Sequence, residues 1–109
     1  VYASSSGVLG ARPDGQPADE GSPPDAMVRD NLYFRSKLLA EEAIATFLQT
    51  SRLPVVLILP GWMFGPGDWA PTSSGRIVLD FLNRRLPVGI PGVGTPVDAR
   101  DVAAAMVAA

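Results

Sequence analysis

Three stretches of regularly spaced apolar residues predict the main ordered elements of this chain. From about Asp30 to Thr50, apolar residues recur at intervals of three and four, as they do along one face of a helix. The continuous apolar run Val55–Leu59 follows at once and is typical of a strand buried on both faces of a parallel sheet. A shorter amphipathic stretch from about Gly75 to Arg85 predicts a second helix.

Weaker signals predict how these elements are joined. Val1-Tyr2-Ala3 reads as the end of a strand, and Ser4-Ser5-Ser6-Gly7 as the polar turn after it. Proline, glycine and acidic residues make 10–28 and 61–75 irregular, and any strand within 89–96 must be short. A last helix covers 102–109.

Acidic residues are the expected helix caps. Asp25 or Asp30 precedes the long helix, and Asp98 or Asp101 precedes the last one. The order strand, loop, helix, strand, loop, helix predicts an α/β fold with a mainly parallel sheet.

Composition removes several kinds of chemistry. The 109 residues include no His and no Cys, so imidazole general bases, thiol nucleophiles and thiolate metal sites are excluded, and we expect no metal. A net charge of −2 means that the chain has no excess of positive charge to attract nucleic acid or anionic lipid. No apolar run reaches the length of a membrane span, and nothing resembles a signal peptide. We therefore expect a cytoplasmic protein.

One pair of residues suggests catalysis. Tyr33 and Lys37 lie four positions apart on the long predicted helix, so both side chains project from the same face. A cation beside a phenol favours the phenolate, and a Tyr tuned in this way can exchange a proton with a carbonyl or alcohol oxygen. Packing of the ring and a solvated lysine would give the same spacing, but Lys37 is the only Lys in the chain.

Four blocks of sequence, taken in order, resemble the extended short-chain dehydrogenase/reductase family, most closely its epimerase/dehydratase and dihydroflavonol-reductase-like branch. The resemblance covers essentially the whole chain. The blocks are Val1-Tyr2-Ala3-Ser4-Ser5-Ser6-Gly7-Val8-Leu9-Gly10, Tyr33-Phe34-Arg35-Ser36-Lys37-Leu38-Leu39-Ala40-Glu41, Leu59-Pro60-Gly61-Trp62-Met63-Phe64-Gly65-Pro66-Gly67-Asp68 and Val97-Asp98-Ala99-Arg100-Asp101-Val102-Ala103.

The resemblance implies a Rossmann-type doubly wound fold and an NAD(P)-dependent oxidoreductase or epimerase. By match to the family motif, Tyr33 is the catalytic acid/base, and Lys37 binds the nicotinamide ribose and tunes that Tyr. Ser5 is the substrate-orienting hydroxyl, with Ser4 and Ser6 as alternatives in register.

The resemblance also implies a cofactor-facing segment and two structural ones. Pro60, Gly61, Trp62 and Met63 match the segment that faces the nicotinamide, although Trp62 and Met63 could equally pack in a core. Gly65-Pro66-Gly67 matches a structural turn, and the block around Asp98 a helix start.

The glycine-rich phosphate-binding turn of the family, Gly-x-Gly-x-x-Gly opening a helix after a strand, does not occur in this sequence. We therefore expect residues 1–109 to be the central to C-terminal part of an incomplete NAD(P)-binding domain, a fragment without the N-terminal strands, and inactive in isolation. The choice between NAD and NADP stays open, as does a homodimer of the full-length protein.

Three other functions stay open. The first is a nucleotide-sugar epimerase or dehydratase of the same family, for which Arg76 and Arg84 or Arg85 could meet phosphates. The second is a non-catalytic NAD(P)-binding domain, and the third an unrelated α/β interaction module. The apolar Trp62, Phe64 and Trp69 favour a small, apolar substrate over a nucleotide sugar.

Overall fold

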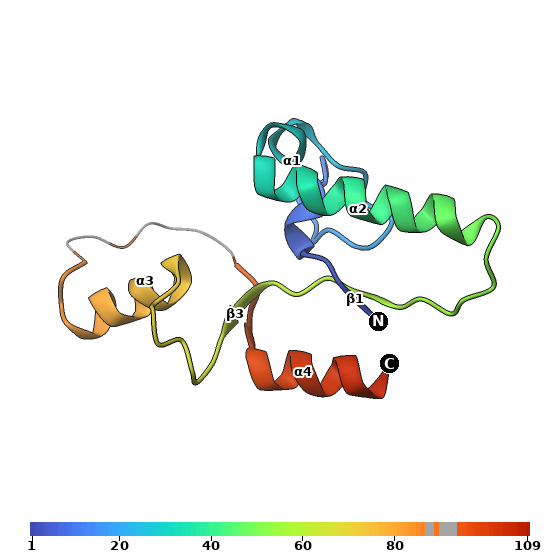
Figure 1. The fold of residues 1–109 in the computed structure, drawn as a ribbon. Coiled ribbons are helices and arrows are strands. Elements are labelled where there is room, and N and C mark those ends of the chain that lie inside the picture. Colours follow the sequence, from blue (N-terminus) through green and yellow to red (C-terminus); the bar gives the residue numbers. More distant parts are fainter. Residues whose placement is uncertain (87–88, 90–93) are drawn as a thin grey trace. The chain divides into compact units, whose positions relative to one another are not determined.

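The structure is a computed structural model that describes residues 1–86, 89 and 94–109 (Figure 1). It divides into two compact units, Val1–Pro60 and Gly61–Ala109, and each is described by itself. The stretch 89–96, in which we predicted at most a short strand, lies partly outside the described residues, at 90–93.

The first unit is built on a pair of parallel strands. β1 (Tyr2–Ala3) pairs with β2 (Leu57–Ile58), with Tyr2 opposite Leu57 and Ala3 opposite Ile58. Backbone hydrogen bonds continue past the strand end, because the Ser6 N–H donates to the Pro60 carbonyl oxygen at 2.9 Å. A 3-10 turn, η1 (Ser6–Val8), follows β1 directly. The backbone of the serine segment (residues 4–6) is therefore hydrogen-bonded to β2 and to the residues that follow it.

The long helix predicted from about Asp30 to Thr50 is α2 (Leu32–Leu48), and a short helix that was not predicted, α1 (Ala26–Asp30), precedes it. Asn31 separates them because its backbone is extended, with φ −83° and ψ 115°, and its side chain accepts hydrogen bonds from the N–H groups of Tyr33 and Phe34. An Asn in this conformation starts a helix and cannot continue one. Asp25 caps α1 through the Val28 N–H, so the irregular segment ends at Asp25 and not at 28.

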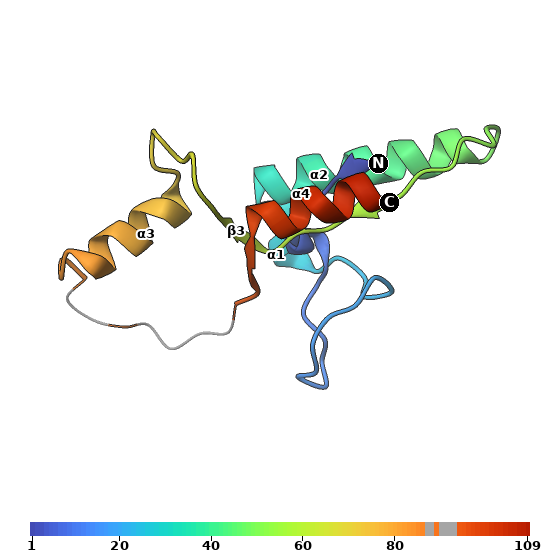
Figure 2. The same ribbon diagram turned by 90° about the horizontal axis from the view of Figure 1, so that it is seen from below.

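The irregular segment before α1 leaves the helices as a long loop and comes back to its starting point (Figure 2). Asp25 closes it, because its second carboxylate oxygen accepts the Ala11 N–H at 3.1 Å. The hydrogen bonds from the Ala11 and Val28 N–H groups lower the pKa of Asp25, and the bond from Ala11 is the larger cause. Gly10 is required at the closure, since a Cβ there would lie 2.2 Å from the Pro23 carbonyl oxygen.

The second unit contains another parallel pair. β3 (Trp62–Phe64) pairs with β4 (Pro96–Asp98), and Met63 lies opposite Val97. The prediction that 61–75 is wholly irregular is therefore wrong at β3. A strand this short between Pro60-Gly61 and Gly65-Pro66 has no alternation to detect, and its partner is distant in sequence.

Helices follow both strands of the second unit. α3 (Ser73–Leu82) begins earlier than predicted because Thr72 caps it by accepting the Gly75 N–H at 3.2 Å. α4 (Ala99–Ala108) is capped by Asp98, which confirms one of the two expected caps. The order of strands and helices, with parallel pairing in both units, confirms an α/β organisation.

Little of the apolar surface is buried among the described residues. Val8, Val28 and Val102 are the buried hydrophobic residues. The strand run Val55–Leu59 was predicted to be buried on both faces, yet β2 is only half-buried and Val56 is exposed. The physical reason is that, within the described ranges, this sheet contains β1 and β2 alone, so β2 lacks the further strands of a full parallel sheet. The apolar face of α3 is exposed as well, with Phe81 71% accessible.

Candidate active site

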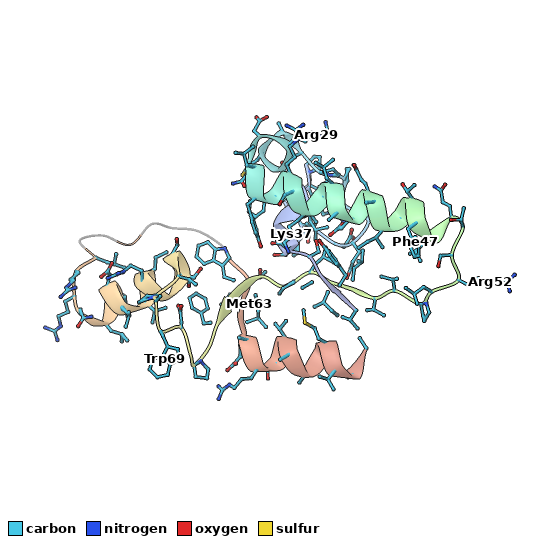
Figure 3. The ribbon with its side chains drawn as sticks, in the orientation of Figure 1. Arg29, Lys37, Phe47, Arg52, Met63 and Trp69 are labelled. Carbon is cyan, nitrogen blue, oxygen red and sulfur yellow. The ribbon has the colours of Figure 1, made fainter. Side chains whose placement is uncertain are left out.

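Lys37 is fixed at the end of β1. Its Nζ atom donates to the Ala3 carbonyl oxygen at 3.0 Å. The same ammonium lies 5.7 Å from the centroid of the Tyr2 ring and 6.0 Å from that of Tyr33, within the range of cation–π attraction. Figure 3 shows Lys37 on the side of α2 that faces the strand. The cation therefore sits between two aromatic rings and a backbone carbonyl and does not extend freely into solvent.

Tyr33 lies in the first turn of α2 with its side chain 56% accessible. Its backbone N–H donates to Asn31 Oδ1 at 3.0 Å, and its carbonyl oxygen accepts from Ser36 Oγ at 2.7 Å. The ring packs edge to face on Phe34, with centroids 5.5 Å apart. The backbone and the ring are thus well supported, and the hydroxyl has no hydrogen-bond partner within the described ranges.

The three serines after β1 have different environments. Ser4 is buried, and its hydroxyl donates to Oε1 of Glu41 on α2. Ser5 caps η1, its Oγ accepting the Gly7 N–H at 3.2 Å, which leaves its own proton free to donate. The Ser6 hydroxyl makes no hydrogen bond to any other described residue. The Ser4 hydroxyl is therefore used in a contact within the fold, whereas the hydroxyl groups of Ser5 and Ser6 can still donate to a ligand.

These groups fit the ribose end of a nicotinamide cofactor. Lys37 has three ammonium donors, and one of them is used by Ala3. Its remaining donors and the exposed Tyr33 hydroxyl would hold ribose and substrate oxygens. The phosphate groups have no matching cradle in this sequence, because the glycine-rich turn is not among these residues.

The expected cofactor-facing segment is divided between the two units. The Pro60 carbonyl oxygen accepts from Ser6 N–H in the first unit. Gly61, Trp62 and Met63 belong to the second. The side chains of Trp62 and Met63 are 58% and 48% accessible, so neither fills a core in this structure. Gly61 has a structural reason of its own, since a Cβ there would lie 2.1 Å from the Thr95 carbonyl oxygen.

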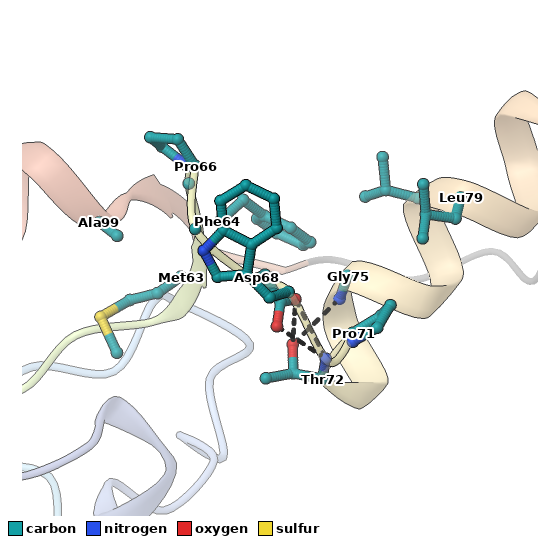
Figure 4. Close-up of a pocket in the computed structure, with 13 residues that line it drawn as sticks. Met63, Phe64, Pro66, Asp68, Pro71, Thr72, Gly75, Leu79 and Ala99 are labelled. Carbon is teal, nitrogen blue, oxygen red and sulfur yellow. Dashed lines mark hydrogen bonds between the residues drawn. The ribbon is translucent and has the colours of Figure 1, made fainter.

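The second unit holds a pocket of about 710 Å³ between β3, the turn after it, and α3. Phe64, Pro66 and Leu79 contribute apolar surface, as do Met63, Trp69 and Val78, and Asp68 and Thr72 provide the polar groups (Figure 4). The lining is mainly apolar. Such a pocket suits a hydrocarbon or aromatic moiety better than a highly charged one.

The polar side of this pocket is already hydrogen-bonded. Both carboxylate oxygens of Asp68 accept the Thr72 N–H at 3.0 Å, and Oδ2 also accepts from the Thr72 hydroxyl. Thr72 in turn caps α3 (Figure 4). Gly67 has φ +93°, a conformation that favours glycine, and Gly65 closely approaches Ala99. The expected structural turn at Gly65-Pro66-Gly67 therefore also forms one wall of the pocket.

Asp98 and Arg100 form an ion pair in the second unit, with 2.5 Å between Nη2 and Oδ2. The Arg100 side chain, and then its backbone N–H, lower the pKa of Asp98 to about 2. Asp98 stabilises the start of α4, because its carboxylate accepts the Arg100 backbone N–H and places negative charge at the helix N-terminus.

Two polar residues of the first unit have roles that were not predicted from the sequence. Asn31 sets the start of α2. Asn is a preferred N-cap residue, so its position shortly before Tyr33 could have predicted where this helix begins. Glu41 binds the buried Ser4 hydroxyl, and the only local hint was its position one turn beyond Lys37.

Two features are absent from the described residues. No cluster of three or more acidic side chains in residues 1–86, 89 and 94–109 is arranged to hold a metal ion. In the same residues, no helix is long and apolar enough to cross a membrane.

Two curated proteins are similar to this chain. One, from Synechocystis sp., carries the provisional name dihydroflavonol 4-reductase and is 38% identical over 106 residues. The other, sterol demethylase protein B of Methylococcus capsulatus, is 32% identical over 105 residues. Each alignment covers 95% of this chain but only 30% and 31% of the two relatives. No solved structure gave a significant match.

The model of the NAD dependent epimerase/dehydratase family matches residues 1–109, which is the whole chain. Membership implies a Rossmann-like α/β fold and binding of a nicotinamide cofactor, and the parallel strand pairs agree with that fold. The resemblance inferred from the four sequence blocks is thereby confirmed: this chain belongs to the NAD-dependent epimerase/dehydratase family.

Proposed function

We propose that this chain carries the catalytic segment of an NAD(P)-dependent oxidoreductase that acts on a hydroxyl or carbonyl carbon of a small substrate. Tyr33 exchanges the proton, Lys37 supports it and binds the cofactor ribose, and Ser5 orients the substrate oxygen. Pro60, Gly61, Trp62 and Met63 face the nicotinamide. The segment belongs to a doubly wound Rossmann-type domain whose phosphate-binding part is not among these residues.

The observation that carries this proposal is the placement of Lys37. A lysine that only solvated a helix surface would extend into water, but this one is bonded to Ala3 and lies 6.0 Å from the Tyr33 ring centroid. This placement holds the ammonium beside the Tyr33 ring. That is the electrostatic condition for Tyr33 to work as an acid and as a base.

The proton chemistry then follows from the chain's own groups. When bound, a nicotinamide cofactor supplies or accepts the hydride. In the reducing direction the Tyr33 hydroxyl gives its proton to the substrate oxygen as that oxygen gains negative charge, and in the oxidising direction it takes the proton back. Ser5 donates a hydrogen bond to the same oxygen with the proton that its bond to Gly7 leaves free.

The pocket of the second unit supports a small apolar substrate. Its lining is mainly apolar, and its two polar side chains, Asp68 and Thr72, are hydrogen-bonded to each other. The names of the two relatives refer to a dihydroflavonol and a sterol, neither of which is a nucleotide sugar. An aromatic or alicyclic ketone is the corresponding substrate class.

A nucleotide-sugar epimerase or dehydratase is the second candidate, favoured by the description of the family that the chain matches. It would use the same Tyr33 and Lys37 and would need groups that bind a diphosphate. Arg76 on α3 is exposed and could supply one of them.

Replacement of Tyr33 by Phe tests the proposal in the intact protein. Turnover should fall by about 10²- to 10⁴-fold, the usual contribution of a general acid/base, while the Kd for NADPH, read from its fluorescence, stays within about twofold. Tyr2→Phe is the matched control, since it removes the other phenol hydroxyl and keeps the ring beside Lys37. Full activity of the Tyr33 variant would overturn the assignment.

Two substrate panels separate the candidates. We expect oxidation of NADPH or NADH with acetophenone or cyclohexanone, and no interconversion of UDP-glucose and UDP-galactose. The opposite result would favour the epimerase. Binding of cofactor without turnover of either panel would favour the non-catalytic domain.

A further inference from the structure

The proposed chemistry uses Ser5, Tyr33 and Lys37 but leaves a neighbouring polar contact unexplained. Ser4 is only 4% accessible, and its hydroxyl donates to Oε1 of Glu41. The partners are 37 positions apart, so the bond joins the end of β1 to α2. A buried hydroxyl with a carboxylate acceptor is a strong and specific tertiary contact.

Among the described residues, Glu41 takes part in no ion pair. The ion pairs of the described residues join Arg12 to Asp14 and Asp19, and Arg100 to Asp98, so none of them includes Glu41 or Lys37. Glu41 is therefore not acting as the counter-ion of the catalytic lysine. Its described contact is with Ser4.

Successive contacts along one face of α2 hold the serine segment. Lys37 binds the Ala3 carbonyl oxygen, Glu41 binds the Ser4 hydroxyl, and the Phe34 ring covers Gly7 so closely that a Cβ there would lie 2.1 Å from it. Residues at these spacings share a helix face.

The opposite side of the same segment is fixed by β2 and the residues after it. The Ser4 N–H donates to the Ile58 carbonyl oxygen at 2.8 Å, and the Ser6 N–H donates to that of Pro60 at 2.9 Å. Ser5 thus lies between two backbone anchors. The side-chain bond from Ser4 to Glu41 sets how the chain approaches Ser5 from β1.

We propose that Glu41 is a positioning residue that acts through Ser4 to hold the Ser5 hydroxyl in place for the substrate oxygen. This inference rests on the proposed function, because it assumes that Ser5 orients the substrate. Loss of Glu41 would leave the Ser4 hydroxyl without its partner and let the segment shift. A displacement near 1 Å at a catalytic group lowers turnover by about 10²-fold.

The first test needs no substrate. The Gly7 amide donates to Ser5 Oγ, so its hydrogen exchange, measured by NMR on the intact protein, reports the position of the Ser5 side chain. Glu41→Ala should speed this exchange by about the factor that Ser5→Ala does, since Ser5→Ala removes the acceptor itself. The Val28 amide, held by Asp25, is the internal reference and should not change. Unchanged exchange at Gly7 in Glu41→Ala overturns the proposal.

Matched variants separate positioning from charge. Glu41→Gln keeps a side-chain oxygen that can accept from Ser4, and we expect exchange at Gly7 close to that of the unaltered protein. Glu42→Ala is the control for loss of an acidic side chain from α2, because Glu42 is exposed, and it should have no effect. If Glu41→Gln behaves like Glu41→Ala, the charge and not the hydrogen bond matters, and the proposal is wrong.

Kinetics with acetophenone and NADPH add the functional readout. Glu41→Ala should lower kcat by about 10- to 100-fold with the KM for NADPH unchanged. In a Ser5→Ala background the same change should have little further effect, because the group that Glu41 positions is gone. A full additional loss in that background overturns the inference.

Failure of the proposed function gives a different pattern. In that case Tyr33→Phe and Ser5→Ala would keep full activity, whereas the exchange of the Gly7 amide would still report on Glu41. If Glu41→Ala does not fold, Ser4→Ala replaces it, since it removes the same bond from the other side. Ser4→Ala should then speed the Gly7 exchange and lower kcat in the same way, and no change in either measurement would overturn the proposal.

Discussion

The ammonium of Lys37 donates to the carbonyl oxygen of Ala3 at 3.0 Å, which joins the second turn of α2 to the last residue of β1. This bond fixes the position of the cation relative to the strand end. It leaves two ammonium donors for a ligand and holds the charge near the Tyr33 ring.

Removal of the Lys37 charge should impair catalysis more than folding. We expect Lys37→Met to lower kcat by about 10²-fold or more and to raise the KM for the cofactor, because both phenolate stabilisation and a ribose donor are lost. Lys37→Arg should have a kcat nearly as low as that of Lys37→Met, since a planar guanidinium does not replace a compact ammonium. Steady-state kinetics measure both effects. Arg35→Met, at an exposed position of the same helix, is the control, and an equal loss there would contradict the prediction.

Asn31 is expected to set the stability of α2. Its side chain accepts from two backbone N–H groups of the first turn, those of Tyr33 and Phe34. Asn31→Ala should lower the free energy of unfolding by about 1 kcal/mol, measured by urea unfolding. Asp30→Ala is the matched control, because Asp30 ends α1 and does not cap α2. If Asp30→Ala costs as much as Asn31→Ala, the cap is misassigned.

Gly7 and Phe34 should be coupled. A Cβ on Gly7 would lie 2.1 Å from the Phe34 ring, so Gly7→Ala must displace that ring. We expect a loss of about 1 to 3 kcal/mol, as for other overpacked sites. Phe34→Leu should recover part of it in the double variant. Strictly additive effects in the double-mutant cycle would show that the two residues do not share this space.

The helix start at Asp98 should make stability depend on pH in acid. Arg100 lowers the pKa of Asp98 to about 2 in the folded chain, from an ordinary value of 3.8. A lowered folded-state pKa means that the stabilisation is present above pH 3.8 and is lost as the pH falls toward 2. Asp98→Asn should therefore be less stable than the unaltered protein at pH 5, and the difference should shrink between pH 4 and 2. Urea midpoints across this range measure it.

Salt provides the control for this ion pair. The Arg100 side chain is 73% accessible, so added NaCl should reduce the difference at pH 5. Asp101→Asn, in the first turn of the same helix, should show a smaller dependence on pH. An equal dependence in the two variants would contradict the assignment of Asp98 as the cap.

Local sequence was enough for the features that depend on neighbouring residues. The spacing of Tyr33 and Lys37 placed both on one helix face, and α2 and its contacts agree. Parallel α/β organisation and the Asp98 cap were also predictable, because helix periodicity, apolar runs and caps are properties of short segments. The order of four motif blocks was enough to identify the family.

Other features required the tertiary structure. β3 was missed because a three-residue strand is defined by its pairing with β4, and pairing is not encoded in local alternation. Asn31 was read as part of a helix, since only its extended backbone reveals the break. The choice among Ser4, Ser5 and Ser6 could not come from identical side chains in a row. Their environments set Ser4 apart from Ser5 and Ser6, because α2 brings Glu41 to Ser4 across 37 positions of sequence, and only the folded chain determines that contact.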